Sequence, residues 1–444
     1  MYMKLPEKYI EHMKSLLSKA DFFAYLDEME KPSTKGIRFN PLKGISEDKA
    51  VSMVEGILEK VPWAEHAYYY SDSARPGNLP LHEAGLYYIQ EPSAMSAVTV
   101  LDVHPGEKVL DLCAAPGGKS TQIGAKLEGK GILISNEPNA QRARILSQNI
   151  ERMGIRNAVV LCEYPEKLVD NFEEYFDRIL VDAPCSGEGM FRKNPEAMEE
   201  WSSEAPERCH LRQLDILEAA SEMLIENGIL VYSTCTFNDK ENEETVYKFL
   251  EKHTEFELMP FTLPGLEKKS EGLLHLYPFE VQGEGHFLCK MRKKEKGIEK
   301  KDRKKENKPI KKKKEDAFSA LPEIIPSGLE KIRIGDRIWC PPDLFDPERI
   351  RTLHCLRYGL GLAVIKGKQI EPDHALAMAM NCSQASSTQE LTWEEMCAYQ
   401  AGETIKREAS KGYTLLHYQG ISLGFGKCSD GLIKNHYPKG LRKR

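Results

Sequence analysis

Hydrophobic and polar positions alternate in two different ways between residues 91 and 294. Five short aliphatic runs have the length of buried strands: 108–112, 131–135, 158–161, 177–181 and 228–232. Three longer stretches between them repeat their apolar residues at helical spacing: 120–127, 140–153 and 207–226. Strands that alternate with helices predict a mostly parallel sheet covered by helices. We therefore expect an α/β domain in the middle of the chain.

The segments on either side have other patterns. The first 90 residues mix amphipathic helix patterns with short extended runs, which favours a small α+β module. Residues 292–314 hold 14 Lys or Arg and 4 Asp or Glu with almost no apolar side chains, a composition typical of a flexible basic linker. A mixed α/β segment follows, and the last part alternates short strand patterns with glycines, as in a β-rich module. The predicted parts are 1–90, 91–291, 292–316, 317–385 and 386–444.

Composition narrows the class of protein. The 444 residues include eleven cysteines without a C-x-x-C pair or a zinc-ligand spacing, which predicts reduced thiols, a cytoplasmic location and no metal site. No run approaches about 18 apolar residues, so no membrane partner is expected. A net charge of −6 requires any nucleic acid to be met by local basic patches.

The first chemical motif is a small-residue turn in "LDLCAAPGGKST". A predicted strand ends at Asp111, the turn follows, and a helix opens near Lys119. Small residues allow close approach of a ligand, and a helix N-terminus offers free N–H groups, so a nucleotide-like ligand is expected. A phosphate-binding P-loop is excluded because Cys113 stands where its first glycine would be. A simple tight turn is the remaining alternative.

Glu137 ends the next predicted strand, about 20 residues after the turn. An acidic residue at this place binds ribose hydroxyls in dinucleotide-binding and adenosyl-binding folds. A carboxylate alone is more often a favourable charge at a helix N-terminus. Its combination with the turn favours the ribose role.

Two cysteines follow further predicted strands, Cys185 in "VDAPCSGEGMFRK" and Cys235 in "YSTCTFNDKENEE". Because the carboxyl ends of parallel strands share one edge of a sheet, we expect two exposed thiols at one cleft. Hydride transfer needs no thiol pair. Methylation of cytosine carbon 5 uses a thiolate that adds to carbon 6, and it needs a base that later removes the proton from carbon 5. The chemistry gives two roles and does not rank the cysteines.

These motifs, with "QGEGHFLCKM" after them, resemble the Sun (nucleolar-protein/Sun) family of RNA cytosine-5 methyltransferases over residues 90–291. The tail "GFGKCSDGLIKNHYPKGLR" resembles the bacterial RsmF branch, which modifies small-subunit rRNA near the decoding site. The resemblance implies a Rossmann-like, S-adenosylmethionine-dependent core. It also implies an N-terminal α+β RNA-binding module and C-terminal mixed α/β and PUA-like modules.

The resemblance ranks the thiols: Cys235 attacks the base and Cys185 assists release, with Asp182 and Lys119 near the base. It also implies a site for S-adenosylmethionine, made of Cys113, Ala114, Ala115, Pro116, Gly117, Gly118, Lys119, Glu137 and Asp182, with Arg142 as a further candidate. Relatives have an aspartate near the adenine where this chain has Tyr164. We expect either Tyr164 or the neighbouring Glu163 to take its place.

The expected partner is RNA, in the form of small-subunit (16S) rRNA or the 30S subunit, and not DNA; the chain is expected to be a monomer. Transfer RNA is an alternative substrate, and a non-catalytic ribosome-assembly factor is an alternative class. Arg38 and Asn40 match a family element that touches RNA. Candidates for RNA contact in the tail are Lys434, His436, Tyr437, Lys439, Arg442 and Lys443.

Overall fold

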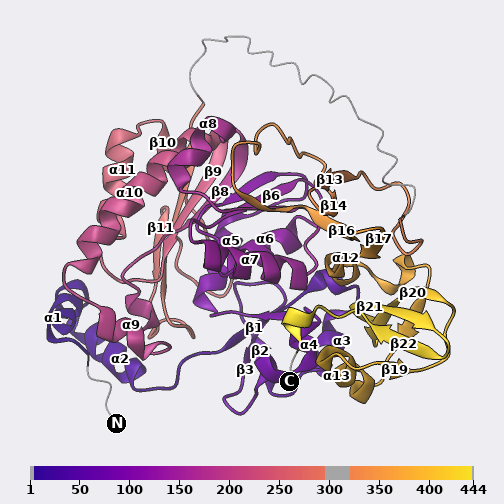
Figure 1. Ribbon diagram of the computed structural model, residues 1–444. Coiled ribbons are helices and arrows are strands. Elements are labelled where there is room, and N and C mark those ends of the chain that lie inside the picture. Colours follow the sequence, from indigo (N-terminus) through magenta and orange to yellow (C-terminus); the bar gives the residue numbers. More distant parts are fainter. Residues whose placement is uncertain (1–4, 296–320, 443–444) are drawn as a thin grey trace.

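The computed structural model describes residues 5–295 and 321–442 (Figure 1). Most of the predicted linker, 292–316, and Lys443 lie outside the described residues. We refer to residues 5–90 as the N-terminal module, to 91–293 as the central domain and to 321–442 as the C-terminal region.

A nine-stranded sheet forms the central domain. Its parallel strands are β5 (Lys108–Asp111), β6 (Ile132–Asn136), β7 (Ala158–Leu161), β8 (Phe176–Asp182) and β9 (Leu224–Thr234). Its antiparallel strands are β10 (Phe256–Leu258), β11 (Leu273–Leu276), β12 (His286–Lys293) and β15 (Cys355–Tyr358). The order is β10-β12-β9-β8-β5-β6-β7-β15, with β11 beside β12. All five predicted strands are confirmed.

Helices cover both faces of this sheet (Figure 1). One face packs against α5 (Ser96–Leu101), α6 (Gly118–Lys126) and α7 (Ala140–Arg152). The other packs against α8 (Val169–Phe172), α10 (Ala205–Met223) and α11 (Glu243–Lys252). The helix predicted to reach residue 226 ends at 223. This boundary was wrong because Leu224 is extended and pairs with Phe176 in the sheet.

The order of the parallel strands reverses at the β5–β8 pair. From β5 the chain adds β6 and β7 on one side, then returns to add β8 and β9 on the other. Loops that leave the carboxyl ends of β5 and β8 therefore diverge, and in such sheets ligands bind in the crevice between them. The predicted turn and the two cysteines all follow strands at this edge.

The N-terminal module supports the loops of this edge. Its sheet has the order β2 (Ile57–Lys60), β3 (Ala67–Tyr70), β1 (Gly36–Phe39) and β4 (Tyr87–Ile89), accompanied by α3 (Glu47–Ser52) and α4 (Pro80–Glu83). Helices α1 (Glu7–Leu16) and α2 (Lys19–Met29) pack beside α9 (Pro195–Glu200) (Figure 1). The rings of Tyr9 and Phe191 meet edge to face at 5.1 Å, and those of Tyr25 and Phe237 at 5.7 Å. Phe191 and Phe237 belong to the segments that follow the two cysteines.

The C-terminal region contains two sheets. One has the order β13 (Ile332–Ile334), β14 (Arg337–Cys340), β16 (Leu360–Lys366) and β17 (Gln369–Pro372). The other has the order β18 (Thr388–Glu390), β20 (Gly412–Tyr418), β21 (Ile421–Ser429), β22 (Leu432–Asn435) and β19 (Ile405–Lys406). Helices α12 (His374–Ala379) and α13 (Trp393–Ala401) complete it.

The C-terminal region is joined to the rest of the molecule by strand pairing and by a shared core. Strand β15 extends the central sheet by pairing with β7. In addition, Met396 and Tyr399 of α13 share a hydrophobic core with Leu81 and Tyr87 of the N-terminal module. The three parts therefore pack as one body.

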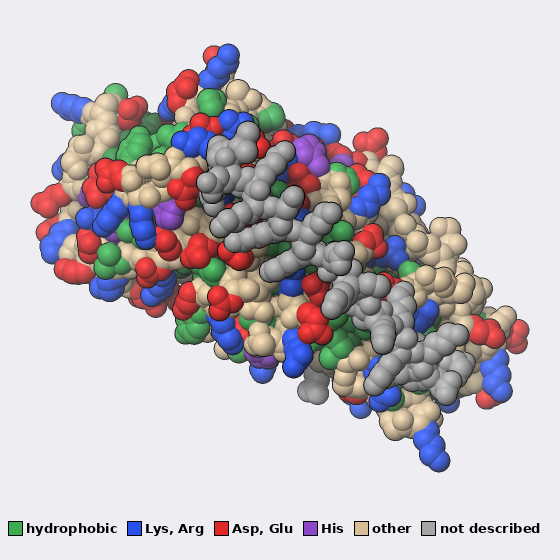
Figure 2. Space-filling model, turned by 90° about the horizontal axis from the view of Figure 1, so that it is seen from above, with side chains coloured by type: hydrophobic (Ala, Val, Ile, Leu, Met, Phe, Trp, Pro, Cys, Tyr) green, Lys and Arg blue, Asp and Glu red, His purple; other side chains and the backbone are tan. Residues whose placement is uncertain are grey.

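The surface shows no separation of charge by sign in the view of Figure 2, where Lys and Arg side chains alternate with Asp and Glu. In the described part of the chain, no helix is both long and apolar enough to cross a membrane.

Candidate active site

The predicted turn connects β5 to α6 in a shape that requires glycine. Gly117 has φ of +115°, in the region that favours glycine, and a Cβ added there would lie 3.2 Å from Leu146 Cδ1. Two side chains of α7 hold the turn from outside: Arg142 donates to Ala115 O at 3.0 Å, and Asn149 donates to Pro116 O at 2.9 Å. The turn is thus fixed as a close-fitting cradle at the start of α6.

Asp111 lies under this turn and is fully buried. Its Oδ2 accepts a hydrogen bond from Ser120 Oγ at 2.6 Å, while Oδ1 has no partner among the described residues. Burial raises the pKa of this carboxyl to about 7. A buried acceptor without a partner is costly, so this oxygen is available to a ligand's donor.

Glu137 stands between β6 and α7 and is buried. Its Oε1 accepts from the backbone N–H of Asn139 at 2.9 Å, and its Oε2 lies 3.3 Å from Arg142 Nη1. The carboxylate is close to the N-terminus of α7 and follows the carboxyl end of β6, so both roles considered for it fit this position. Arg142 stays largely exposed.

Tyr164 and Glu163, the two candidates for a contact with the adenine, have different surroundings. The side chain of Tyr164 is 67% exposed. The Glu163 carboxylate instead binds Lys167 Nζ at 2.8 Å and the backbone N–H of His354 at 2.6 Å. Glu163 therefore ties the loop after β7 to the C-terminal region.

The two predicted cysteines meet. Cys185 follows β8 and Cys235 follows β9, and their sulfur atoms lie 3.3 Å apart, at hydrogen-bond distance. Both residues are half-buried, not exposed as predicted. The hydrogen bond to Cys235, together with burial, raises the pKa of Cys185 well above its ordinary value. Cys185 therefore keeps its proton near neutral pH.

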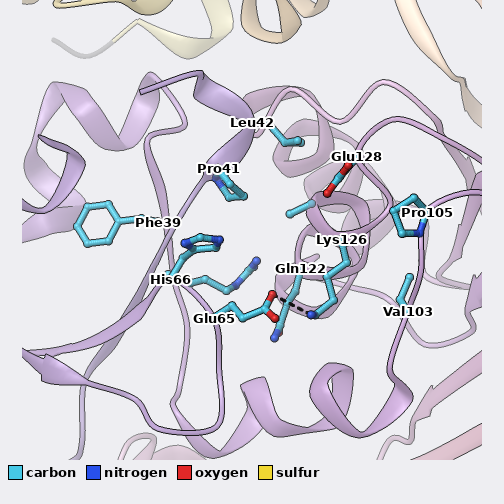
Figure 3. Close-up of a pocket in the computed structure, with 12 residues that line it drawn as sticks. Phe39, Pro41, Leu42, Glu65, His66, Val103, Pro105, Gln122, Lys126 and Glu128 are labelled. Atoms are coloured by element: carbon cyan, nitrogen blue, oxygen red, sulfur yellow. Dashed lines mark hydrogen bonds and ion pairs between the residues drawn. The ribbon is translucent and has the colours of Figure 1, made fainter. Parts of the chain in front are cut away.

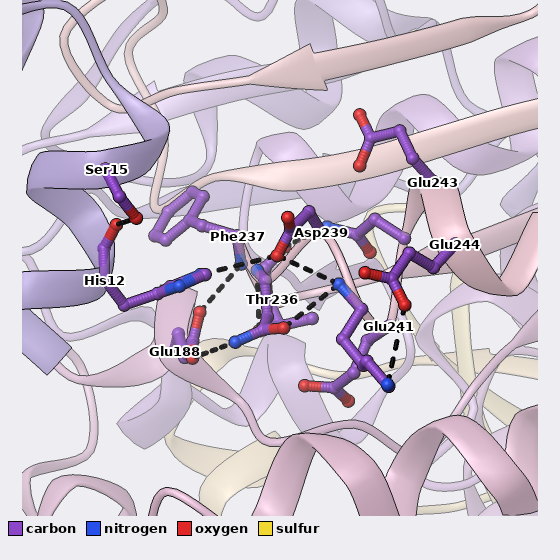
Figure 4. A network of polar contacts seen from close by, with 12 residues as sticks. His12, Ser15, Glu188, Thr236, Phe237, Asp239, Glu241, Glu243 and Glu244 are labelled. Atoms are coloured by element: carbon purple, nitrogen blue, oxygen red, sulfur yellow. Dashed lines mark hydrogen bonds and ion pairs between the residues drawn. The ribbon is translucent and has the colours of Figure 1, made fainter. Parts of the chain in front are cut away.

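Hydrogen bonds connect the two loops that carry the cysteines, and Figure 4 shows those between Glu188 and the segment after Cys235. The backbone N–H of Gly189 donates to Cys235 O at 2.8 Å, and the hydroxyls of Ser186 and Thr236 lie 2.9 Å apart. A side chain at Gly189 is excluded because its Cβ would come within 2.9 Å of Cys235 O. The distance between the two thiols is thus set by contacts on both sides.

Two buried carboxyl groups strengthen this lock. Glu241 accepts hydrogen bonds from the Ser186 N–H at 2.9 Å and from Gln213 Nε2 at 3.0 Å, and burial raises its pKa to about 7. Glu188 accepts from Trp201 Nε1 and from the Phe237 N–H, both at 3.2 Å, and burial raises its pKa too. Neither carboxyl group was predicted from the sequence, although each lies within one of the two cysteine motifs.

An ion pair lies beside the thiols. Lys119 Nζ, in the first turn of α6, donates to Asp182 Oδ2 at 2.6 Å, and Ser233 Oγ donates to Oδ1 at 2.9 Å. Burial alone would raise the pKa of Asp182, but the ammonium of Lys119 and these hydrogen bonds outweigh it and lower the pKa. The predicted neighbours Lys119 and Asp182 are therefore held as a charged pair.

His286, at the start of β12, lies next to this pair. Its Nε2 is 3.6 Å from Asp182 Oδ1, and neither ring nitrogen has a hydrogen-bond partner among the described residues. Burial, with the nearby Lys119 charge, lowers the pKa of His286 to about 3, so the ring is neutral. It adds no charge to the site.

Two predicted RNA contacts are wrong. Arg38 is buried, and its Nη2 donates to Gly118 O and Thr121 Oγ1, each at 2.9 Å. Asn40 is buried as well and donates to Gly85 O and Met153 O, each at 2.9 Å. Both residues attach the N-terminal module to the central domain.

Arg38 also lines a cavity of about 410 Å³ beside α6 (Figure 3). An ion pair between Glu65 and Lys126, 2.9 Å long, crosses this cavity.

The predicted stacking role of Tyr437 is also wrong. Only 2% of Tyr437 is exposed, and its ring packs edge to face on Tyr399 at 5.4 Å and on His374 at 5.2 Å.

No group of three or more His, Cys, Asp or Glu side chains within residues 5–295 and 321–442 could hold a metal ion.

Three protein-family models match this chain. A model of 16S rRNA methyltransferase RsmB/F matches residues 98–292, the N-terminal domain of 16S rRNA methyltransferase RsmF matches 5–92, and the methyltransferase RsmF PUA domain matches 386–443. Ribosomal RNA small subunit methyltransferase F of Vibrio vulnificus is 34% identical over 98% of this chain and 97% of its own length. The chain belongs to the RsmF family. The Aliivibrio fischeri member is 33% identical over the same shares.

Solved structures agree with this assignment. A methyltransferase homolog protein from Pyrococcus horikoshii is 29% identical, with a TM-score of 0.57 over 66% of this chain and 96% of that one. NSun6 from Pyrococcus horikoshii, 23% identical with a TM-score of 0.58 over 67% and 100%, shares the fold. This RsmF-family chain is thus an S-adenosylmethionine-dependent rRNA methyltransferase, and the predicted cofactor, Rossmann-like core and PUA-like module are confirmed.

The residues present fit that cofactor. Gly117 lets the turn pack closely on Leu146 of α7, the N-terminus of α6 opens beside the turn, and Asp111 has a buried oxygen without a partner among the described residues. Glu137 offers a buried carboxylate at the end of the next strand, the place at which ribose hydroxyls bind in related folds.

Proposed function

We propose that this RsmF-family enzyme forms 5-methylcytidine in 16S rRNA through a covalent bond between Cys235 and the cytosine ring. The observation that carries the proposal is the 3.3 Å contact between the sulfur atoms of Cys185 and Cys235. Oxygen and nitrogen atoms of a base already carry lone pairs that can attack a methyl group. A ring carbon must first be activated, and a thiol nucleophile does this by adding to the ring.

The resemblance to the Sun family ranks the thiols, with Cys235 as the nucleophile. Cys185 lies at hydrogen-bond distance from it, in position to act on the same ring. Cys235 Sγ bonds to carbon 6, and the π electrons between carbons 5 and 6 move to carbon 5. Lys119 would stabilise the negative charge that develops on the ring, and Asp182 would accept from the amino group.

S-adenosylmethionine, when bound, supplies the electrophilic methyl carbon that carbon 5 attacks. We propose that it is held by backbone and side-chain groups of Cys113, Ala114, Ala115, Pro116, Gly117, Gly118, Lys119, Glu137 and Asp182. Arg142 would support this site by holding the turn and Glu137 in place.

The contact between the thiols also bears on release. Once Cys235 Sγ is bonded to carbon 6 it carries no charge, which removes one cause of the raised pKa of Cys185 while burial remains; we propose that Cys185 then loses its proton to solvent. The Cys185 thiolate then takes the proton from carbon 5, and the double bond between carbons 5 and 6 re-forms. The bond between Cys235 and carbon 6 breaks, which returns Cys235 as a thiolate and Cys185 as a thiol.

Trapping of the adduct tests these roles. With S-adenosylmethionine and 16S rRNA, Cys185→Ala should accumulate a protein–RNA adduct that survives a denaturing gel, because release is blocked. Cys235→Ala should form none. Cys209→Ala, a half-buried cysteine outside the thiol pair, is the matched control and should turn over like the wild type. An adduct that depends on Cys185 and persists without Cys235 would reverse the roles.

Incorporation of tritiated methyl groups into 16S rRNA, 30S subunits and tRNA tests the substrate. We expect label in 16S rRNA or 30S subunits, recovered as 5-methylcytidine after digestion. Label confined to tRNA would favour the alternative substrate, and no label in any of the three would favour a non-catalytic assembly factor.

A further inference from the structure

We propose that a second cleft, distinct from the thiol site, binds the phosphate backbone of the RNA substrate; the identity of the ligand rests on the proposed function. The cleft has a volume of about 610 Å³, in the range of sites that hold ligand-sized groups. All three parts of the molecule line it: His82 of the N-terminal module, Arg144 and Arg152 of α7, and Arg337 and Trp339 of the C-terminal region.

The lining is cationic. Four arginines face two glutamates, and one of these glutamates, Glu151, is already engaged by Arg357 at 2.6 Å. Arg144 is exposed and makes no ion pair with a described residue. Arg337 lies 3.3 Å from Asp373 but keeps 43% of its side chain exposed. Guanidinium groups recognise phosphate oxygens in pairs, so these two walls suit a phosphodiester chain.

The floor of the cleft holds a third cation, Arg152. Its Nη1 donates to the carbonyls of His82 at 2.8 Å and Tyr87 at 3.2 Å. Burial lowers the pKa of Arg152, and the nearby Glu83 carboxylate, also in the lining, opposes this only in part. A phosphate entering the cleft would add negative charge beside this desolvated cation.

The cleft borders the cofactor turn. Asn149 lines the cleft and also donates to Pro116 O, in the turn that starts α6. His374, on the opposite wall, has a buried Nδ1 without a partner among the described residues. RNA bound here would be held next to the catalytic edge by a surface that exists only when all three parts are assembled.

Charge reversal tests the cleft in the full-length chain. The double variant Arg144→Glu with Arg337→Glu removes the two accessible wall cations and leaves Arg152, which holds backbone carbonyls. Arg351→Glu is the control, because Arg351 is 76% exposed and does not line the cleft. A 16S rRNA transcript is the probe, measured by filter binding at several salt concentrations and by methyl transfer.

We expect the double variant to weaken RNA binding at least tenfold and to reduce the slope of log affinity against log salt by about 1 to 2. KM for RNA should rise at least tenfold, with the affinity for S-adenosylmethionine within twofold of the wild type. If charge reversal impairs folding, the double variant Arg144→Gln with Arg337→Gln should still weaken binding at least threefold. Binding within twofold of the wild type in a folded variant would overturn the proposal.

Two further outcomes separate the cleft from the chemistry. If the wild type forms no 5-methylcytidine but RNA binding still depends on Arg144 and Arg337, the cleft stands and the proposed function fails. If single-stranded DNA of the same sequence binds as tightly and loses affinity equally in the variant, the cleft is a general polyanion site and the assignment to RNA is overturned.

Discussion

The ion pair between Lys119 and Asp182 joins the first turn of α6 to the end of β8, and the side chains are 10% and 30% exposed. Asp182→Asn should therefore lower the free energy of unfolding at pH 7 by about 2–4 kcal/mol, because it leaves the ammonium of Lys119 without its carboxylate. Methyl transfer should fall at least a hundredfold. Urea unfolding and a tritiated-methyl assay measure the two effects.

A double variant separates stability from catalysis. Lys119→Met with Asp182→Asn removes both charges, so most of the lost stability should return while activity stays low. If activity returns with stability, the pair is structural and not part of the chemistry. The sign of the pH effect follows from the lowered pKa of Asp182: its stabilisation is present above about pH 4 and is lost as the pH falls through the lowered pKa.

At the scale of residues, the sequence predicted best those side chains whose place follows from a strand end. Cys185 and Cys235 each follow an aliphatic run, so neighbouring parallel strands were sufficient to bring them together. Arg38 could not be placed in this way, because its partner Gly118 is 80 residues away and only packing brings them together. Tyr437 beside cations fits either a stacking surface or a core, and the sequence contains no signal that distinguishes the two.

At the scale of elements, Glu241 connects the loop after β8 to the segment after β9. Its pKa of about 7, against an ordinary value of 4.5, means that the folded state holds a proton that the unfolded state has released between these pH values. Glu241 therefore makes stability fall by up to about 3 kcal/mol as the pH rises through this window. Glu241→Gln should match the wild type at pH 5 and exceed its stability at pH 8.

Thermal unfolding at pH 5, 6, 7 and 8 checks this difference. Glu244→Gln, three residues later in the first turn of α11 and with 56% of its side chain exposed, should follow the wild type at each pH. A pH dependence in Glu241→Gln equal to that of the wild type would assign the effect to other buried carboxyls.

Helices and strands could be predicted from the sequence where a single hydrophobic pattern was clear. The central strands were found because aliphatic runs are buried on both faces of a parallel sheet. The end of α10 was missed because Leu224 and Ile225 continue the apolar character of the helix while their backbone is already extended. Strand β15 carries no sequence signal for its neighbour, since pairing with β7 depends on backbone groups that every residue offers.

At the scale of the whole molecule, the core shared by α13 and the N-terminal module makes the two ends of the chain support each other. Met396 is fully buried in that core, so Met396→Ala should lower the free energy of unfolding by about 2–5 kcal/mol. Cys397→Ala, at the exposed neighbouring position of α13, should change it by less than about 0.5 kcal/mol. Hydrogen exchange should also speed up in β4 of the Met396→Ala variant. Exchange confined to α13 would show that the two parts are not coupled.

This shared core also constrains the order in which the protein can be completed during translation. The ribosome makes the N-terminal module before the central domain, yet Leu391, Met396 and Tyr399, which cover part of its apolar surface, are added only after that domain. Until they emerge, that surface faces water or a chaperone. The native contacts of the N-terminal module are therefore complete only when the C-terminal region has folded.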